Sequence, residues 1–360
     1  MIFDLVLSIF LLLSPIIFTS FGFAARYQWY QFGYFSNSIN LLQLQFFQYG
    51  TVMLFLVALF SKPKRLFQDK YFGILFALCI WSVFLHPKTI QNFYNIFLGF
   101  LLYYLVVTYT KNAKSILKVV VIVATLNTLF AILQFFHINL IYYPKADIIG
   151  LMSYKSQLGI YQALALPICY TLNPYLSIIP LIGLLLSKSV TAIIPAIIGM
   201  AYLFRKKISN LRFSYIYFMV FITSLIFLCI KSFNKLSLRF DVWVVTLQMI
   251  FKKWLYGYGI GTFKYINSKH IQYDDPYGLY LGVTYALGIL GIIALILFLK
   301  DKFIRIKNNA LIAQGLLVSC LILVLCGFGY SFLDYPRLAG TIIPLFAFLE
   351  ILKRKENYEN

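Results

Sequence analysis

Apolar runs of roughly 15–22 residues follow one another along almost the whole chain, with short polar segments between them. A helix of this length matches the hydrocarbon thickness of a bilayer. The pattern therefore predicts an all-α polytopic membrane protein, one integral membrane domain over 1–360 with about twelve transmembrane helices. The predicted spans are 2–20, 42–60, 71–85, 92–109, 116–136, 157–172, 174–187, 190–204, 213–230, 278–299, 310–328 and 338–352.

The first span and the two short middle spans allow other interpretations. Segments 157–172 and 174–187 are separated only by Asn173 and Pro174, so a re-entrant hairpin is an alternative to two full spans. The first segment contains Asp4 and has no basic residue before it, which is atypical of a signal peptide. We expect it to be a retained first span.

Charge is distributed unevenly between the loops. Only 12% of the residues are charged, against about 25% in soluble domains, yet the formal net charge is +20. The basic residues concentrate in alternate short loops, and the positive-inside rule then places both termini in the cytoplasm. Because topology explains the charge, no nucleic-acid partner is expected. The basic clusters are Lys62/Lys64/Arg65/Lys70, Lys111/Lys114/Lys118, Arg205/Lys206/Lys207/Arg212, Lys300/Lys302/Arg305/Lys307 and Lys353/Arg354/Lys355.

The longest polar interruption, residues 231–278, falls between the ninth and tenth predicted spans on the outer side, the periplasm in a cell with two membranes. Irregular backbone is costly in lipid and is kept where it meets water or lines a cavity. This outer loop is basic although the topology favours few cations there, so we expect an anionic ligand. Its basic residues are Lys231, Lys235, Arg239, Lys252, Lys253, Lys264 and Lys269.

Several function classes are disfavoured by what the sequence does not contain. Ion-coupled carriers usually bury charged residues at mid-membrane, whereas here Asp4 and Glu350 lie at span ends and the other acidic residues lie in loops or tails. No inverted repeat with matching broken helices is visible. A P-loop, HExxH and GxSxG are absent, which argues against ATPases, zincins and hydrolases. All five cysteines fall inside predicted spans, which argues against disulfides and a zinc site.

An amphipathic helix is predicted to start near Ser237, a plausible N-cap. The arginine on this face has a planar fork of donors that suits phosphate oxygens. The tryptophan four residues later offers a flat surface to a sugar ring or to the lipid interface. The alternative is an interfacial helix that these side chains only anchor. The face consists of Arg239, Trp243, Thr246, Ile250 and Lys253.

Glycines and carboxylates follow this helix. Gly257, Gly259 and Gly261 alternate with other residues, so their backbone amides could surround an anion, or the segment is a flexible turn that ends the helix. Asp274 and Asp275 are paired carboxylates at a membrane surface that is otherwise basic. One of them is a candidate general base, and the alternative is a solvated turn.

Three further cations are expected on the same membrane face as Arg239. Lys155 lies among polar residues just before a span, Lys188 lies in the turn between the seventh and eighth spans, and Arg337 lies in the last outer loop. A polyprenyl pyrophosphate would be bound well by such a grouping of cations.

The order of these motifs resembles the shared domain of O-antigen ligases and polymerases, over residues 150–300. The segments SYKSQLGIYQALALPI and LLLSKSVTAIIPAII also resemble middle spans of that family. The motifs are Arg239-Phe-Asp-Val-Trp243, Gly259-Ile-Gly261-Thr-Phe263, and Leu279-Tyr280-Leu281 through Gly288 and Gly291.

The resemblance implies a GT-C-like glycosyltransferase that uses undecaprenyl-pyrophosphate-linked oligosaccharide on the outer face of the bacterial inner membrane, without cofactor, nucleotide sugar or metal. Arg239 matches the position that is thought to hold the pyrophosphate. Family ligases carry a His-Asn pair, with the His as base, where this chain has Tyr277-Gly278. This difference favours a polymerase. The base is left open among Asp275, Asp274 and His270, and Tyr277 occupies the ligase histidine position.

The expected substrate-binding residues are Arg239, Trp243, Lys155, Lys188, Arg337, Gly259 and Gly261. The expected partners are the lipid-linked oligosaccharide, membrane lipids and a chain-length regulator protein. One alternative function is a ligase that transfers finished glycan to lipid A core or to protein. A second is a flippase or exporter of lipid-linked oligosaccharide.

Overall fold

The structure is a computed structural model of the chain. It describes residues 2–14, 35–138, 148–152, 154–205, 239–266, 272–273, 276–304, 311–330 and 336–359, with only the backbone described at 35–43, 91–92, 205, 272–273, 304, 336–337 and 353–359. The predicted span 213–230 lies outside these residues, as do His270, Asp274 and Asp275.

The described chain is mostly helical, as predicted. A helix over 239–252 and a two-residue antiparallel strand pair, β1 (Tyr265–Ile266) with β2 (Gln272–Tyr273), lie in the predicted outer loop. The other helices are α1 (Ile2–Leu13), α3 (Phe35–Leu59), α4 (Lys70–Leu85), η1 (Pro87–Thr89), α5 (Ile90–Tyr109), α6 (Ala113–Phe135), α7 (Lys155–Leu172), η2 (Pro174–Ser177), α8 (Ile178–Ser187), α9 (Val190–Arg205), α11 (Leu279–Ile304), α12 (Leu311–Cys326) and α13 (Pro336–Glu359).

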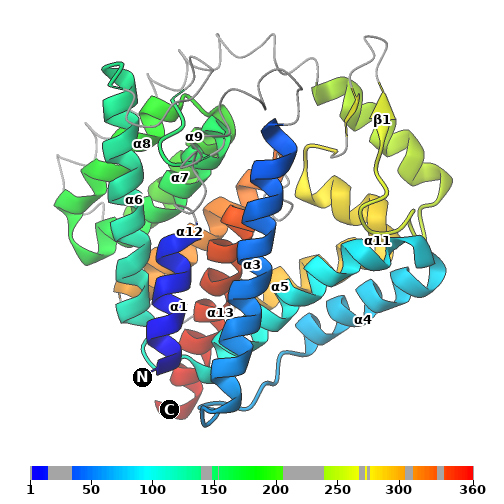
Figure 1. The fold of residues 1–360 in the computed structure, drawn as a ribbon, viewed down its shortest axis with the longest axis horizontal. Helices are drawn as coiled ribbons and strands as arrows, with labels where there is room; N and C mark the ends of the chain where they lie inside the picture. Colours follow the sequence, from blue (N-terminus) through cyan, green and yellow to red (C-terminus); the bar gives the residue numbers. More distant parts are fainter. Residues whose placement is uncertain are drawn as a thin grey trace.

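The helices support a membrane protein in outline. Within the described residues, Ala113–Phe135 and Leu279–Phe303 are long and apolar enough to cross a membrane, and several shorter helices are also apolar. Large apolar side chains are exposed on the surfaces of many helices, as lipid contact requires. The N-terminal end of α1 and the C-terminal end of α13 lie at the same end of the molecule (Figure 1). The number of about twelve spans stays a prediction.

Helix α7 is the centre of the main core. Nearly all of its side chains are buried, and it packs against α12, α8, α9 and α6. Small residues let these helices approach closely, as in membrane bundles. A Cβ atom on Gly315 of α12 would lie only 2.4 Å from the Thr171 hydroxyl oxygen. Figure 1 shows α6–α9 grouped on one side, α4, α5 and α11 on the other, and α1, α3 and α13 between them.

A second, smaller core joins the helix over 239–252 to the first part of α11. Its buried side chains are Val242, Ile250, Phe263 and Tyr285. The ring of Tyr285 stacks on Tyr258 at 4.9 Å between centroids and meets Phe263 edge-on at 5.1 Å. The helix predicted in segment 231–278 is therefore confirmed over 239–252, with Val242 and Ile250 buried against the aromatic rings, while its expected N-cap Ser237 lies outside the described residues.

Helix α11 is broken at Gly288, which has φ +69° and ψ −163°. The glycine-rich turn after 239–252 docks on this break. Tyr258 and Gly259 donate their backbone N–H groups to the carbonyls of Tyr285 and Ala286 at 2.8 and 3.1 Å. Ile289 donates in return to the Trp254 carbonyl at 2.8 Å. The expected span 278–299 therefore contains a break at Gly288. Hydrogen bonds from the glycine-rich turn satisfy the backbone polar groups that the break leaves without helical partners.

Substituting Gly288 with alanine should be strongly destabilising. A Cβ there would lie 2.2 Å from the Leu255 carbonyl oxygen, and the positive φ disfavours any L side chain. We expect the Gly288→Ala variant to lose about 2 kcal/mol or more, measured by thermal unfolding of the purified protein. Gly282→Ala in the same helix is the matched control, since its nearest contact would be Pro276 at 3.6 Å. Equal unfolding temperatures for the two variants would contradict the positive φ and the close backbone contact at Gly288.

Candidate functional site

Arg239 is held at the beginning of the helix over 239–252. Its Nη1 donates to the Gly329 carbonyl at 3.0 Å, and its Cζ lies 5.5 Å from the centroid of the Tyr277 ring. One turn later, Trp243 Nε1 donates to the Tyr277 carbonyl at 3.3 Å. The fold therefore brings together three of the predicted site residues, Arg239, Trp243 and Tyr277, from two segments more than thirty residues apart.

The beginning of α9 lies beside Arg239 because Gly329 has no side chain. A Cβ atom on Gly329 would lie 3.1 Å from Thr191 Cγ2 and 3.8 Å from Arg239 Nη1. Thr191 Oγ1 is also 3.1 Å from Ser189 Oγ. Lys188 lies with Ser189 in the short turn between α8 and α9, is exposed, and has a left-handed backbone with φ +51°. The exposed Lys188 thus belongs to the turn that packs next to the arginine.

Helix α7 contacts the same turn through its first helical turns. A Cβ atom on Gly159 would lie 2.7 Å from Ser189 Cβ and 2.9 Å from Ser187 Oγ. Lys155 is the first residue of α7, one turn before Gly159. Lys155, Lys188 and Arg239 therefore come from three elements that meet at one end of the bundle.

Of the other ionisable residues predicted for the site, the structure describes only the backbone of Arg337. This backbone lies in the first turn of α13. His270, Asp274 and Asp275 lie outside the described residues. The assignment of the catalytic base among those three stays a prediction.

The glycine-rich segment forms the turn that its sequence suggested. Gly257, Gly259 and Gly261 have φ values of +70°, +97° and +69°, which explains the need for glycine at each position. The Gly259 amide is used inside the protein, since it donates to Ala286. A Cβ there would lie 2.9 Å from the side chain of His86 at the end of α4. For Gly257 and Gly259 this geometry favours the helix-ending turn over an anion-binding loop.

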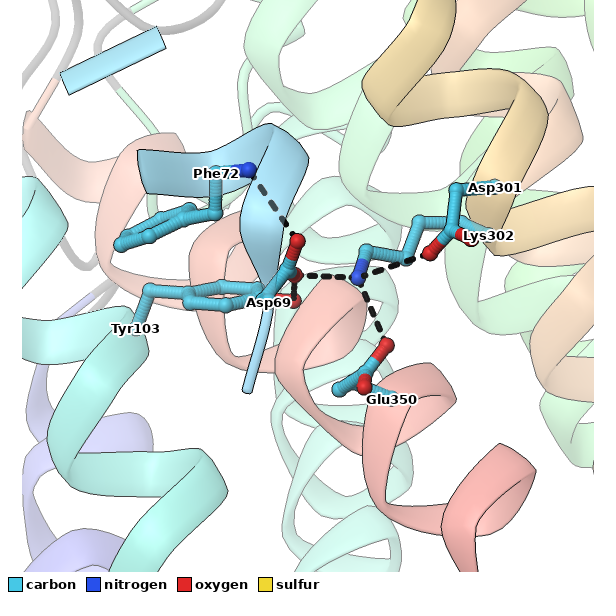
Figure 2. A network of polar contacts seen from close by, with 6 residues as sticks. All are labelled: Asp69, Phe72, Tyr103, Asp301, Lys302 and Glu350. Atoms are coloured by element: carbon cyan, nitrogen blue, oxygen red, sulfur yellow. Dashed lines mark hydrogen bonds and ion pairs between the residues drawn. The ribbon is translucent and has the colours of Figure 1, made fainter. Parts of the chain in front are cut away.

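A buried charge cluster, missed by the sequence interpretation, joins α11, α4 and α13 (Figure 2). Lys302 is fully buried and forms ion pairs with Asp69 and with Glu350, the latter at 2.6 Å, while Asp301 lies 3.7 Å away. Asp69 is also the N-cap of α4, accepting from Phe72 N at 3.0 Å. The Tyr103 hydroxyl donates to it at 2.8 Å.

The interpretation of Lys302 as a loop cation is therefore wrong. Helix α11 continues to Ile304, so Lys302 lies in its last turn and points into the protein. Burial of a charge requires a partner with good geometry, and two carboxylates from other helices supply it. Two acidic residues in the sequence could have indicated this cluster. Asp69 is a capping residue directly before an apolar helix, and Glu350 lies near the end of the last apolar segment.

No protein-family model matches the chain, and no curated protein matches it.

Proposed function

We propose that the protein is an O-antigen or surface-polysaccharide polymerase, joining undecaprenyl-pyrophosphate-linked repeat units on the outer face of the inner membrane. The observation that carries this proposal is the position of Arg239, held between the Tyr277 ring and the Gly329 carbonyl. Lys155 begins α7, and Lys188 lies in the turn between α8 and α9. This turn packs beside Arg239 and α7 contacts the turn, so the two lysines add positive charge at the same end of the bundle. The sequence resemblance of this segment to O-antigen ligases and polymerases supports the same conclusion.

The reaction is a glycosyl transfer without a redox change. A hydroxyl oxygen of the incoming unit attacks the anomeric carbon of the growing chain, and the bond from that carbon to the pyrophosphate oxygen breaks. Undecaprenyl pyrophosphate leaves with the electron pair, and the hydroxyl proton passes to a base. Because the leaving group is already activated, the protein has mainly to position two substrates and stabilise the developing pyrophosphate charge.

Arg239 suits the second task. Among the described residues it donates a hydrogen bond through Nη1 alone, to Gly329. A guanidinium has five N–H donors in a fixed plane, so its other edge can bind two phosphate oxygens side by side. The Tyr277 ring and the Gly329 carbonyl together fix the direction of this edge.

A strain that lacks the gene tests the polymerase directly. We expect glycans of a single repeat unit to remain attached to the lipid A core, with the longer polymer lost, when the polysaccharide is separated on a gel. Loss of all attachment, with polymer still present on the lipid carrier, would instead indicate the ligase.

The base assignment makes a separate prediction. Asp275→Asn should reduce polymer far more than Lys264→Ala, because a carboxamide cannot accept the hydroxyl proton. Lys264 is exposed on the same outer segment and serves as the control. Polymer formed per unit of membrane protein is the measurement. Equal, mild losses in both variants would remove Asp275 from the mechanism.

Two observations favour a second candidate, a flippase or exporter of lipid-linked oligosaccharide. Transporters commonly use broken helices and ionisable residues inside the bundle, and this chain has the break at Gly288 and the Lys302 cluster. Both features weaken the sequence argument against carriers, which was based on the absence of buried charges and broken helices. A membrane-impermeant lectin added to cells that lack the gene separates the functions, since the lipid-linked unit stays out of its reach only if flipping is lost.

A further inference from the structure

Tyr277 has an unfavourable backbone conformation. Its φ is +54°, in the left-handed region that glycine adopts freely and that an aromatic residue seldom adopts. The next residue is a glycine with an ordinary backbone, so the chain places a large side chain where glycine would be easier. Such strain persists only when the surroundings impose it, and it concentrates at functional sites.

The strained conformation directs two groups of Tyr277 toward the helix over 239–252. The main-chain carbonyl accepts from Trp243 Nε1 at 3.3 Å, and the ring faces the Arg239 guanidinium at 5.5 Å. Leu279 then donates its N–H to the Gly327 carbonyl at 2.8 Å, where α11 begins. The segment from Tyr277 to Leu279 thus joins the helix over 239–252 to the beginning of α11 and to Gly327 after α12.

We propose that Tyr277 is a positioning residue for diphosphate binding by Arg239, an inference that rests on the proposed function. The ring faces the guanidinium at Cζ, and the Gly329 carbonyl accepts from Nη1 at one edge. These two contacts leave one orientation for the remaining N–H groups. The ligand class is a polyprenyl diphosphate, whose oxygens receive those N–H groups.

The contacts that define this role use the ring face and the main-chain carbonyl. Neither contact needs the phenolic hydroxyl, so the role differs from that of a general base. Tyr277→Phe should therefore retain binding and polymerisation. The Tyr277→Gly variant adopts the positive φ without strain but also loses the packing of the ring against the core of Val242, Ile250, Phe263 and Tyr285. Its unfolding temperature is therefore measured together with binding, so that a folded variant is the one compared. Tyr277→Asn is a second ring-free variant, since asparagine tolerates a left-handed backbone.

Binding of undecaprenyl pyrophosphate to the purified full-length protein is the decisive measurement. We expect Tyr277→Gly and Tyr277→Asn to bind roughly 3- to 30-fold more weakly than wild type, because holding the guanidinium in place cannot contribute more than the cation–π contact that holds it. The KM for the lipid-linked donor should rise by a similar factor. Tyr256→Ala, which removes an exposed aromatic ring from the same outer segment, should bind as wild type does.

Each outcome has a distinct meaning. Equal binding by wild type and both ring-free variants would overturn the positioning role and leave the proposed function intact. A Tyr277→Phe variant that binds normally but makes no polymer would show that the hydroxyl takes part in catalysis, which also overturns it. Absence of saturable binding by wild type would instead contradict the proposed function itself.

Discussion

Replacing Lys302 with methionine is expected to lower the free energy of unfolding by about 3–5 kcal/mol, the usual cost of removing one partner from a buried ion pair. The substitution leaves Asp69 and Glu350 without their cation in a place that water does not reach. The packing loss is small, because methionine has nearly the length and flexibility of the lysine stem. The unfolding temperature of the purified protein and its level in the membrane both report this loss.

The matched control is Lys300→Met, two residues earlier in the same helix. Lys300 is exposed, so its loss should change stability by less than about 0.5 kcal/mol. A neutral cluster should recover most of the stability, because the cost arises from uncompensated charge. Lys302→Met combined with Asp69→Asn and Glu350→Gln removes the two buried carboxylates that pair with Lys302, and asparagine still caps α4. Only the more exposed Asp301 is left. A Lys302→Met protein that unfolds at the wild-type temperature would show that these charges are not buried together.

Replacing Arg239 with alanine is expected to abolish polymer while the protein remains in the membrane. Removing one donor that stabilises developing charge costs about 10²–10³ in rate, and arginine supplies a charged pair of donors. The side chain is only half-buried and its hydrogen bond is to one carbonyl, so the fold should tolerate the loss. Polysaccharide ladders normalised to protein level are the measurement.

Two further variants separate charge from geometry at this position. Arg239→Lys keeps the charge but cannot bind two oxygens in one plane, so we expect partial activity at best. Lys252→Ala removes an exposed cation from the same helix and should leave the ladder unchanged. Ladders of wild-type length from Arg239→Ala, at normal protein level, would remove Arg239 from the pyrophosphate site.

The positions of most helices followed from the sequence. Helix α9, predicted over 190–204, is observed over Val190–Arg205, and α4, predicted over 71–85, is observed over Lys70–Leu85. The length of an apolar run is a local property, and it largely decides where a helix begins and ends in a chain of this composition. The larger differences occur where polar residues extend a helix, as in α13, which continues to Glu359.

The elements of the candidate site were also visible in the sequence, but not their contacts. Helical spacing placed Arg239 and Trp243 on one face, and glycine indicated the turn that follows. That Arg239 bonds to Gly329 and faces Tyr277 depends on segments far away in the chain. The periodicity of a sequence does not predict contacts between such distant segments.

The sequence by itself determined the helical class, most helix positions and the residue types of the site, because hydrophobic length, periodicity and turn chemistry are local. Only the tertiary structure decided that α11 breaks at Gly288 and that Lys302 turns inward to meet Asp69 and Glu350. Both features depend on partners that are distant in the chain, a backbone turn in one case and two carboxylates in the other. A buried charge or a broken helix is stable only with such partners.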